Sequence, residues 1–141
     1  TKTKFNDNLS VVTNLLIDET ELLIIGIHLY PPTKQWRYQL LNKQMRHLKT
    51  LLKNNSKKVI LLGDLNMTAS SKRFTNFLKE TNLYTYISYK HPTFTWPTFL
   101  PIYLGIQFDH VLFSKNFKMT EKKTTDNFKS DHRPLIVDLV F

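Results

Sequence analysis

The stretch that most constrains the fold lies at residues 59–66, where Val59-Ile60-Leu61-Leu62 leads into Gly63-Asp64-Leu65-Asn66. A short apolar run followed by glycine predicts a β-strand, buried on both faces, that ends in a loop. Because side chains alternate along a strand, Asp64 and Asn66 should point the same way. Burying such a pair without partners is costly, so the pattern favours a functional site. A second interpretation stays open, in which Asp64 caps the turn and Asn66 begins the loop.

The size of the chain predicts one globular domain over residues 1–141, because 41% of its 141 residues are hydrophobic and no linker or repeat divides it. There is no cysteine, which excludes disulfides and thiolate metal sites. No run is long enough to cross a membrane, and the polar start of the sequence does not resemble a signal peptide. The cytoplasm is therefore the default location.

The charge of the chain favours a polyanionic partner. Twenty lysines and arginines against 11 acids give a net charge of +9, which suits nucleic acid or an anionic lipid surface. Many of the lysines fall between residues 43 and 58, where they equally fit the solvated face of a helix. Charge alone leaves the partner open.

The order of the elements predicts an α/β fold built around a mixed, largely antiparallel β-sheet with helices on one face. Apolar alternation indicates strands at about residues 11–17, 22–30, 107–113, 117–122 and 133–141, in addition to the strand that begins at Val59. Helical periodicity indicates helices at about residues 35–52 and 71–81, the first with an apolar stripe. Residues 83–105 read as a long loop, which in a compact domain is often functional. The aromatic residues of this loop could stack bases, enter a lipid headgroup layer or pack the loop itself: Tyr84, Tyr86, Tyr89, Phe94, Trp96 and Phe99.

Four polar clusters lie at the ends of these strands, where a sheet can bring them to one rim. A set of carboxylates and imidazoles with one amide suits hydrolysis of a phosphate ester, because imidazoles and carboxylates move protons while carboxylates hold a divalent cation. No Gly-x-Ser-x-Gly motif supports a serine nucleophile. Taken singly, each cluster also has a structural explanation, such as a hydrogen-bonded core histidine or a pair at a strand entrance. The clusters are His28, Asp64 with Asn66, Asp109 with His110, and Ser130-Asp131-His132.

Five motifs in order carry a family resemblance: Ile27-His28-Leu29-Tyr30-Pro31-Pro32, Gly63-Asp64-Leu65-Asn66, Thr95-Trp96-Pro97, Phe108-Asp109-His110-Val111-Leu112 and Ser130-Asp131-His132-Arg133-Pro134-Leu135. With them the chain resembles the endonuclease/exonuclease/phosphatase superfamily, which includes DNase I-like nucleases, abasic-site endonucleases, sphingomyelinases and inositol polyphosphate phosphatases. The Thr-Trp-Pro element is most similar to small bacterial members. The resemblance implies part of a DNase I-like four-layer α/β/β/α sandwich that hydrolyses phosphate esters with Mg²⁺ or Mn²⁺.

The resemblance also implies roles for five residues. His28 matches the histidine that contacts the scissile phosphate or serves the leaving group. Asp64 matches the aspartate that orients the nucleophile or protonates the leaving oxygen, and Asn66 matches the phosphate-binding asparagine beside it. Asp109 matches the aspartate that hydrogen-bonds the catalytic histidine, which is His132. Such a bond fixes the tautomer of the imidazole.

The metal site implied by the resemblance includes Asp131 and Asp64 as ligands, while Ser130 and Arg133 are expected to be structural, Arg133 by pairing with an acid. Family members also begin with a further segment that carries an asparagine and the principal magnesium-binding glutamate. The stretch before Val11 has no glutamate, and its asparagines Asn6 and Asn8 do not match the asparagine of the family, so the chain resembles the C-terminal half of the fold. The glutamates of the chain do not stand at buried strand ends: Glu19, Glu21, Glu80 and Glu121.

Three expectations follow from that departure. The chain alone should be weak or inactive, because Mg²⁺ needs more oxygen ligands than two aspartates give. The face of the sheet that the other half would cover should be apolar and exposed, which favours a homodimer or a domain-swapped pair. The alternative function is a catalytically degenerate basic module that binds nucleic acid or anionic lipid.

Overall fold

The computed structural model describes residues 10–87, 93–126 and 128–141. In chain order the elements are β1 (Ser10–Ile17), β2 (Thr20–Ile27), α1 (Gln35–Lys53), β3 (Lys58–Asp64), α2 (Lys72–Thr81), β4 (Leu83–Tyr84), the 3₁₀ turn η1 (Ile102–Leu104), β5 (Asp109–Ser114), β6 (Lys118–Thr124) and β7 (Leu135–Val140).

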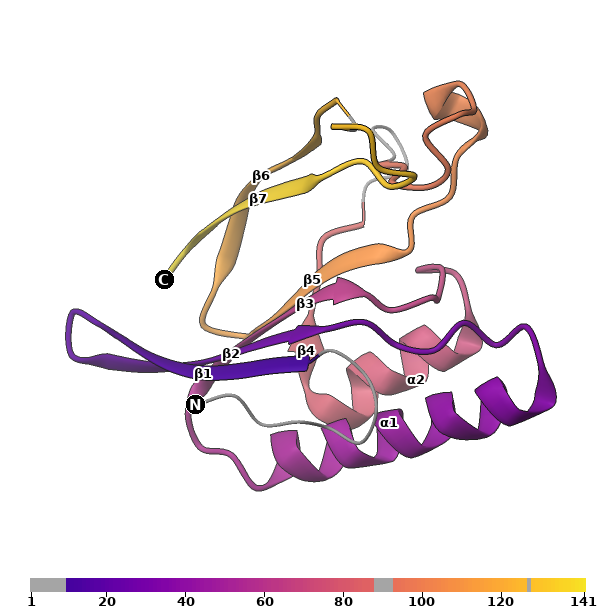
Figure 1. Cartoon of the computed structure of the whole chain (residues 1–141). Coiled ribbons are helices and arrows are strands. Elements are labelled where there is room, and N and C mark those ends of the chain that lie inside the picture. The colour runs from indigo at the N-terminus through magenta and orange to yellow at the C-terminus, as the bar shows by residue number, and fades with distance from the viewer. Residues whose placement is uncertain (1–9, 88–92, 127) are drawn as a thin grey trace.

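The main sheet has five strands in the order β1-β2-β3-β5-β4, and a second sheet pairs β6 with β7. Strands β2 and β3 are parallel, and the other neighbours in the main sheet are antiparallel. Both helices lie against one face of the main sheet, and β6 and β7 lie on its other side (Figure 1). The predicted α/β class, with a mixed and largely antiparallel sheet, is confirmed.

The main core lies between the helices and the sheet. The predicted stripe of α1 is buried, with Leu41 and Leu48 fully enclosed, and each such side chain contributes roughly 1.5–3 kcal/mol. Helix α2 presents Phe74 and Phe77 to the same core. It begins at Ser71, whose Oγ accepts from the Phe74 N–H, and ends at a left-handed Asn82, as caps of these types do.

The strand at residues 59–62 is buried on one face only, so the prediction of burial on both faces is wrong. Val59 and Leu61 are buried under the helices, whereas Leu62 on the opposite face is 38% exposed. The β6–β7 sheet covers this face only in part, through a second cluster formed around Leu22, Phe113 and Phe117. Exposed apolar side chains therefore extend over β1, β3 and β7: Val11, Leu15, Leu16, Leu62, Ile136 and Val140.

The segment predicted as a long loop contains β4, η1 and a bridge between Trp96 and Ile106. Trp96 packs against Phe108, with ring centroids 5.6 Å apart, whereas Phe99 is 78% exposed. Tyr89 falls outside the described residues. No helix in the described part of the chain has both the length and the apolarity needed to cross a membrane.

Candidate functional site

The turn after β3 holds Asp64 and Asn66 together. The Asn66 N–H donates to Asp64 Oδ1 at 2.7 Å, and Asn66 Nδ2 donates to the carbonyl of Leu29 at 2.8 Å and lies 3.3 Å from Asp64 Oδ2. Asn66 adopts a left-handed conformation with φ of 48°, which asparagine tolerates well. The two side chains lie side by side as predicted, and Asp64 also caps its own turn. The turn-capping interpretation therefore holds for Asp64, and a functional role for it stays a prediction.

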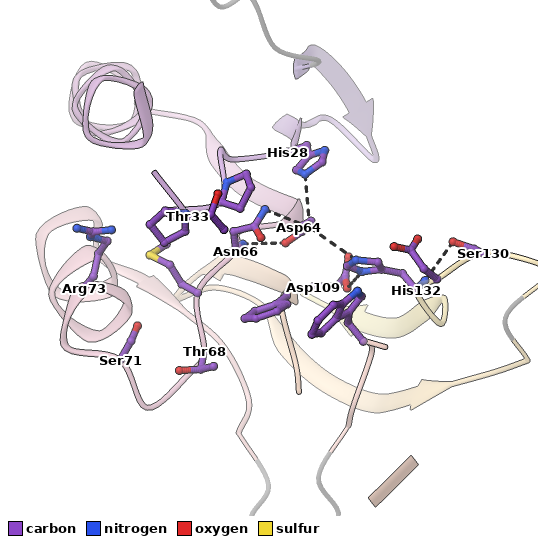
Figure 2. Close-up of a pocket in the computed structure, with 16 residues that line it drawn as sticks. His28, Thr33, Asp64, Asn66, Thr68, Ser71, Arg73, Asp109, Ser130 and His132 are labelled. Carbon is purple, nitrogen blue, oxygen red and sulfur yellow. Dashed lines mark hydrogen bonds and ion pairs between the residues drawn. The ribbon is translucent and has the colours of Figure 1, made fainter. Parts of the chain in front are cut away.

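His28 follows the last residue of β2 and points toward Asp64 (Figure 2). Its Nε2 lies 3.5 Å from Asp64 Oδ2, and its side chain is 57% exposed. The alternative that His28 is a buried core histidine is wrong. His28 comes one residue after the buried Ile27, so its side chain points to the opposite side of the chain.

Asp109 and His132 form a short side-chain contact. His132 Nδ1 lies 2.7 Å from Asp109 Oδ2, and His132 Nε2 lies 3.9 Å from Asp64 Oδ2. Nδ1 therefore carries the proton that it donates to the carboxylate, and Nε2 faces Asp64 across the pocket (Figure 2). The backbone N–H of Asp109 is in turn 3.3 Å from the hydroxyl of the buried Thr95.

Arg133 fixes the segment that carries Asp131 and His132. Its guanidinium donates to the carbonyls of Pro97, Thr98 and Leu100, rather than to the acid that was expected. Ser130 is structural as expected, since its Oγ accepts from the His132 N–H at 3.2 Å.

His110 points away from the pocket although it neighbours Asp109. It is buried, its Nε2 lies 2.8 Å from the carbonyl oxygen of Met67, and its ring centroid is 4.5 Å from that of Phe74. Burial lowers the pKa of His110 to about 4. The structural explanation therefore holds for His110, whereas a functional role for Asp109 stays a prediction.

The clustered groups line one cavity of about 1010 Å³. Asp131 also lines it, so every residue to which the resemblance assigns a catalytic or metal-binding role lies at the same cavity. Burial raises the pKa of the Asp64 carboxyl, and the charge of Asp109 acts in the same direction, while the Asn66 N–H and the two histidines act against it. Trp96, one of the aromatic residues considered for base stacking, lines the cavity too. Sequence reasoning gave no role to the other lining residues, which come from loops and a helix start: Pro31, Pro32, Thr33, Met67, Thr68, Ser71, Arg73 and Phe108.

Sequence comparison identifies the family of the chain. A model of the Endonuclease/Exonuclease/phosphatase family matches residues 3–132, a range that includes His28, Asp64, Asp109 and His132. The chain belongs to this family. Members of the family are hydrolases of phosphate esters, and they generally use divalent metals. No curated protein sequence matches the chain.

Solved structures show the same fold at low sequence identity. An endonuclease/exonuclease/phosphatase family protein from Leptotrichia buccalis C-1013-b has a TM-score of 0.70 at 19% identity, over 94% of this chain and 54% of that one. A 3′ phosphatase from Neisseria bound to a product DNA hairpin has a TM-score of 0.65 at 14% identity, over 92% and 65%. A mannosyl-6-phosphatase from Bacteroides thetaiotaomicron VPI-5482 has a TM-score of 0.60 at 20% identity, over 88% of this chain and 53% of that one. The chain thus spans less than two thirds of each of these relatives.

The residues present do not complete the divalent-metal site that the family implies. Asp64 and Asp131 offer carboxylate oxygens, which Mg²⁺ prefers, but both oxygens of Asp64 already accept hydrogen bonds from Asn66. Within residues 10–87, 93–126 and 128–141, no group of three or more acids and histidines is arranged to hold a metal. The glutamates Glu21, Glu80 and Glu121 pair instead with surface lysines.

His110 makes stability depend on pH. Its pKa falls from 6.5 in the unfolded chain to about 4 in the folded one, so the unfolded state binds more protons between these values. The contribution of His110 to the free energy of unfolding should therefore be fully present above pH 6.5. It should fall by about 3 kcal/mol as the pH approaches 4. Urea unfolding across this range measures the slope, and His110→Gln, which does not titrate, should lack this contribution. An identical slope in both proteins would contradict the assignment.

Proposed function

We propose that the complete protein is a Mg²⁺- or Mn²⁺-dependent hydrolase of phosphate esters, and that this chain alone is weak or inactive. The observation that carries the proposal is the alignment of Asp109, His132, Asp64 and His28 along one wall of the cavity, within 4 Å from each group to the next. Binding alone needs no imidazole held by one carboxylate and facing another. Hydrolysis does, because protons must move while the ester bond breaks.

The geometry suggests a role for each group. In hydrolysis, a water oxygen bonds to phosphorus, the bond to the leaving oxygen breaks, and one proton leaves the water while another reaches the leaving group. His132 Nε2 is free to hydrogen-bond a phosphoryl oxygen or to take the water proton, because Nδ1 is occupied by Asp109. Asp64, whose pKa burial raises, suits the exchange of a proton with a reacting oxygen. His28, on the open side, suits contact with the phosphate.

Asn66 and Asp131 complete the proposed site. The amide nitrogen of Asn66 donates to the carbonyl of Leu29 and to the carboxylate of Asp64. The Asn66 side chain therefore positions Asp64, in addition to any contact that it makes with phosphate. Asp131 and Asp64 are the ligands that this chain would offer a metal. A bound divalent cation would neutralise phosphate oxygens. Because the described residues do not complete its site, further ligands must come from elsewhere.

Hydrolysis of bis(p-nitrophenyl) phosphate tests the proposal. The chain is assayed with Mg²⁺ and with EDTA, before and after His132→Ala. We expect weak turnover that the substitution removes. Robust turnover removed by the same substitution would overturn the proposed inactivity and support the site. Turnover that His132→Ala leaves unchanged would overturn the site.

We also propose that a second copy covers the exposed apolar face in solution. Leu62 and Val11 lie 38% and 51% exposed on neighbouring parts of the main sheet, and exposed apolar patches of this kind favour association. Light scattering at high protein concentration should give the mass of a dimer, and Leu62→Lys should shift the mass toward that of a monomer. Tyr38→Lys, on an exposed position of α1, is the control. A folded monomer at the highest concentration would contradict the proposal.

A further inference from the structure

Arg73 is a cation in the wall of the cavity, and it donates no hydrogen bond to any other residue that the structure describes. It lies in the first turn of α2, half-buried, with its guanidinium carbon 4.6 Å from the centre of the Tyr38 ring. A guanidinium has five N–H donors. Stacking on an aromatic ring orients them without consuming them. Among the described residues, no carboxylate pairs with Arg73 and no oxygen accepts from it, unlike Arg133 with its three carbonyl partners.

The cavity has two chemically different ends. Asp109 and His132 lie at one end, and Arg73, Ser71 and Thr68 lie at the other, with Asp64 and Asn66 between them (Figure 2). Among the described residues that line the cavity, Arg73 is the sole lysine or arginine. Ser71 Oγ accepts from the Phe74 N–H, which leaves its hydroxyl proton for a ligand. This end is therefore equipped to bind an anionic group distinct from the one at His132.

Arg73 also joins this cavity to a basic groove between the helices. A second cavity of about 370 Å³ runs between α1 and α2, and it is lined by Arg73, Lys72, Arg46 and Lys49 among others. Lys49 pairs with Glu80 at 2.5 Å, but Arg46 and Lys72 are exposed. Positive charge thus continues from the cavity along the helix layer, on the face of the sheet away from the exposed apolar patch.

We propose that Arg73 anchors a second phosphate of the substrate, and that this substrate is a nucleic-acid strand whose phosphates continue along the α1–α2 groove. The assignment rests on the proposed hydrolysis, since the first phosphate occupies the His132 end. A small phosphomonoester would fill only that end and leave Arg73 unused. A flat lipid surface meets convex parts of a protein, whereas these cations line a concave path. A strand carries a phosphate at every nucleotide and can follow the groove.

Binding without chemistry tests the anchor. A fluorescein-labelled single-stranded oligonucleotide is titrated with the 141-residue chain in EDTA, at several salt concentrations, by fluorescence anisotropy. Arg73→Gln should weaken binding roughly fivefold and make the salt dependence shallower by about one phosphate contact. Arg73→Lys should retain much of the affinity, because it keeps the charge. Lys118→Gln removes the same charge from the exposed surface of β6, and it should lower affinity far less. Unchanged thermal melting confirms that the variants fold.

The outcomes separate this inference from the proposed hydrolysis. Equal affinity for Arg73→Gln and Lys118→Gln would overturn the anchor, even if ester hydrolysis depends on His132. Preferential binding to anionic phospholipid vesicles, with none to the oligonucleotide, would overturn the choice of a strand. Arg73-dependent binding by a chain whose ester turnover is unchanged by His132→Ala would support the anchor and count against the proposed hydrolytic site.

Discussion

Replacing Gly63 with alanine should lower the free energy of unfolding by about 4 kcal/mol or more. Gly63 has φ of +135°, and a Cβ atom built there would lie 1.9 Å from the backbone oxygen of Ile27. That oxygen belongs to the neighbouring strand β2, so relief requires a shift of backbone rather than of a flexible side chain. The same shift would displace Asp64, the next residue, from His28. Both stability and the site depend on the absence of a side chain at this position.

Urea denaturation measures the effect, and the same sheet offers a matched control. Gly26 lies in β2, and a Cβ built there would meet its nearest atoms, in Val11, at 4.0 Å, which is ordinary contact. Gly26→Ala should therefore change the free energy of unfolding by less than about 1 kcal/mol. If Gly63→Ala proved as stable as Gly26→Ala, the close approach of β2 to this turn would be refuted.

The end of the cavity that carries His132 and the aspartates was predictable because its residues are tied to strand ends. The end of each apolar run marks the end of a strand. Pairing of the strands in the sheet then brings these strand ends together. Asp64 and Asp109 are direct partners in the β3–β5 register. The alternation of side chains along a strand also distinguishes His28 from its buried neighbours Ile27 and Leu29. Alternation also places Asp109 and His110 on opposite faces of β5. It does not predict which of the two faces the cavity.

The other end of the cavity was not predictable, because loops and a helix start build it. Arg73 reads as one of many surface cations in a chain of net charge +9, and only the packing of α2 beside α1 places it over Tyr38. Arg133 likewise satisfies carbonyls of a distant loop rather than an acid. The exposure of Leu62 has the same cause: an apolar run gives no sign of how much of each face its neighbours cover.

Replacing His132 with alanine should reduce phosphodiester turnover about 10²- to 10⁴-fold, the usual contribution of a positioned acid or base. His132 is held by Asp109 at 2.7 Å and faces Asp64 at 3.9 Å. The imidazole of His28 cannot replace it, because His28 contacts Asp64 from the other side. The loss should appear in kcat more than in KM, because the phosphate retains its other contacts. Initial rates with bis(p-nitrophenyl) phosphate, at high enzyme concentration and over long incubations, measure it.

Asp109→Asn distinguishes a catalytic imidazole from a structural one. Asparagine can still accept the Nδ1 proton through its oxygen but carries no charge, so the ring stays in place while the support of a positive charge on it is lost. Turnover should fall by less than for His132→Ala, with thermal stability nearly unchanged. His47→Ala, on α1 and outside the cavity lining, should retain wild-type rates. If His132→Ala matched His47→Ala in rate, the alignment of His132 with the two aspartates would serve packing, and the chemistry would have to lie elsewhere.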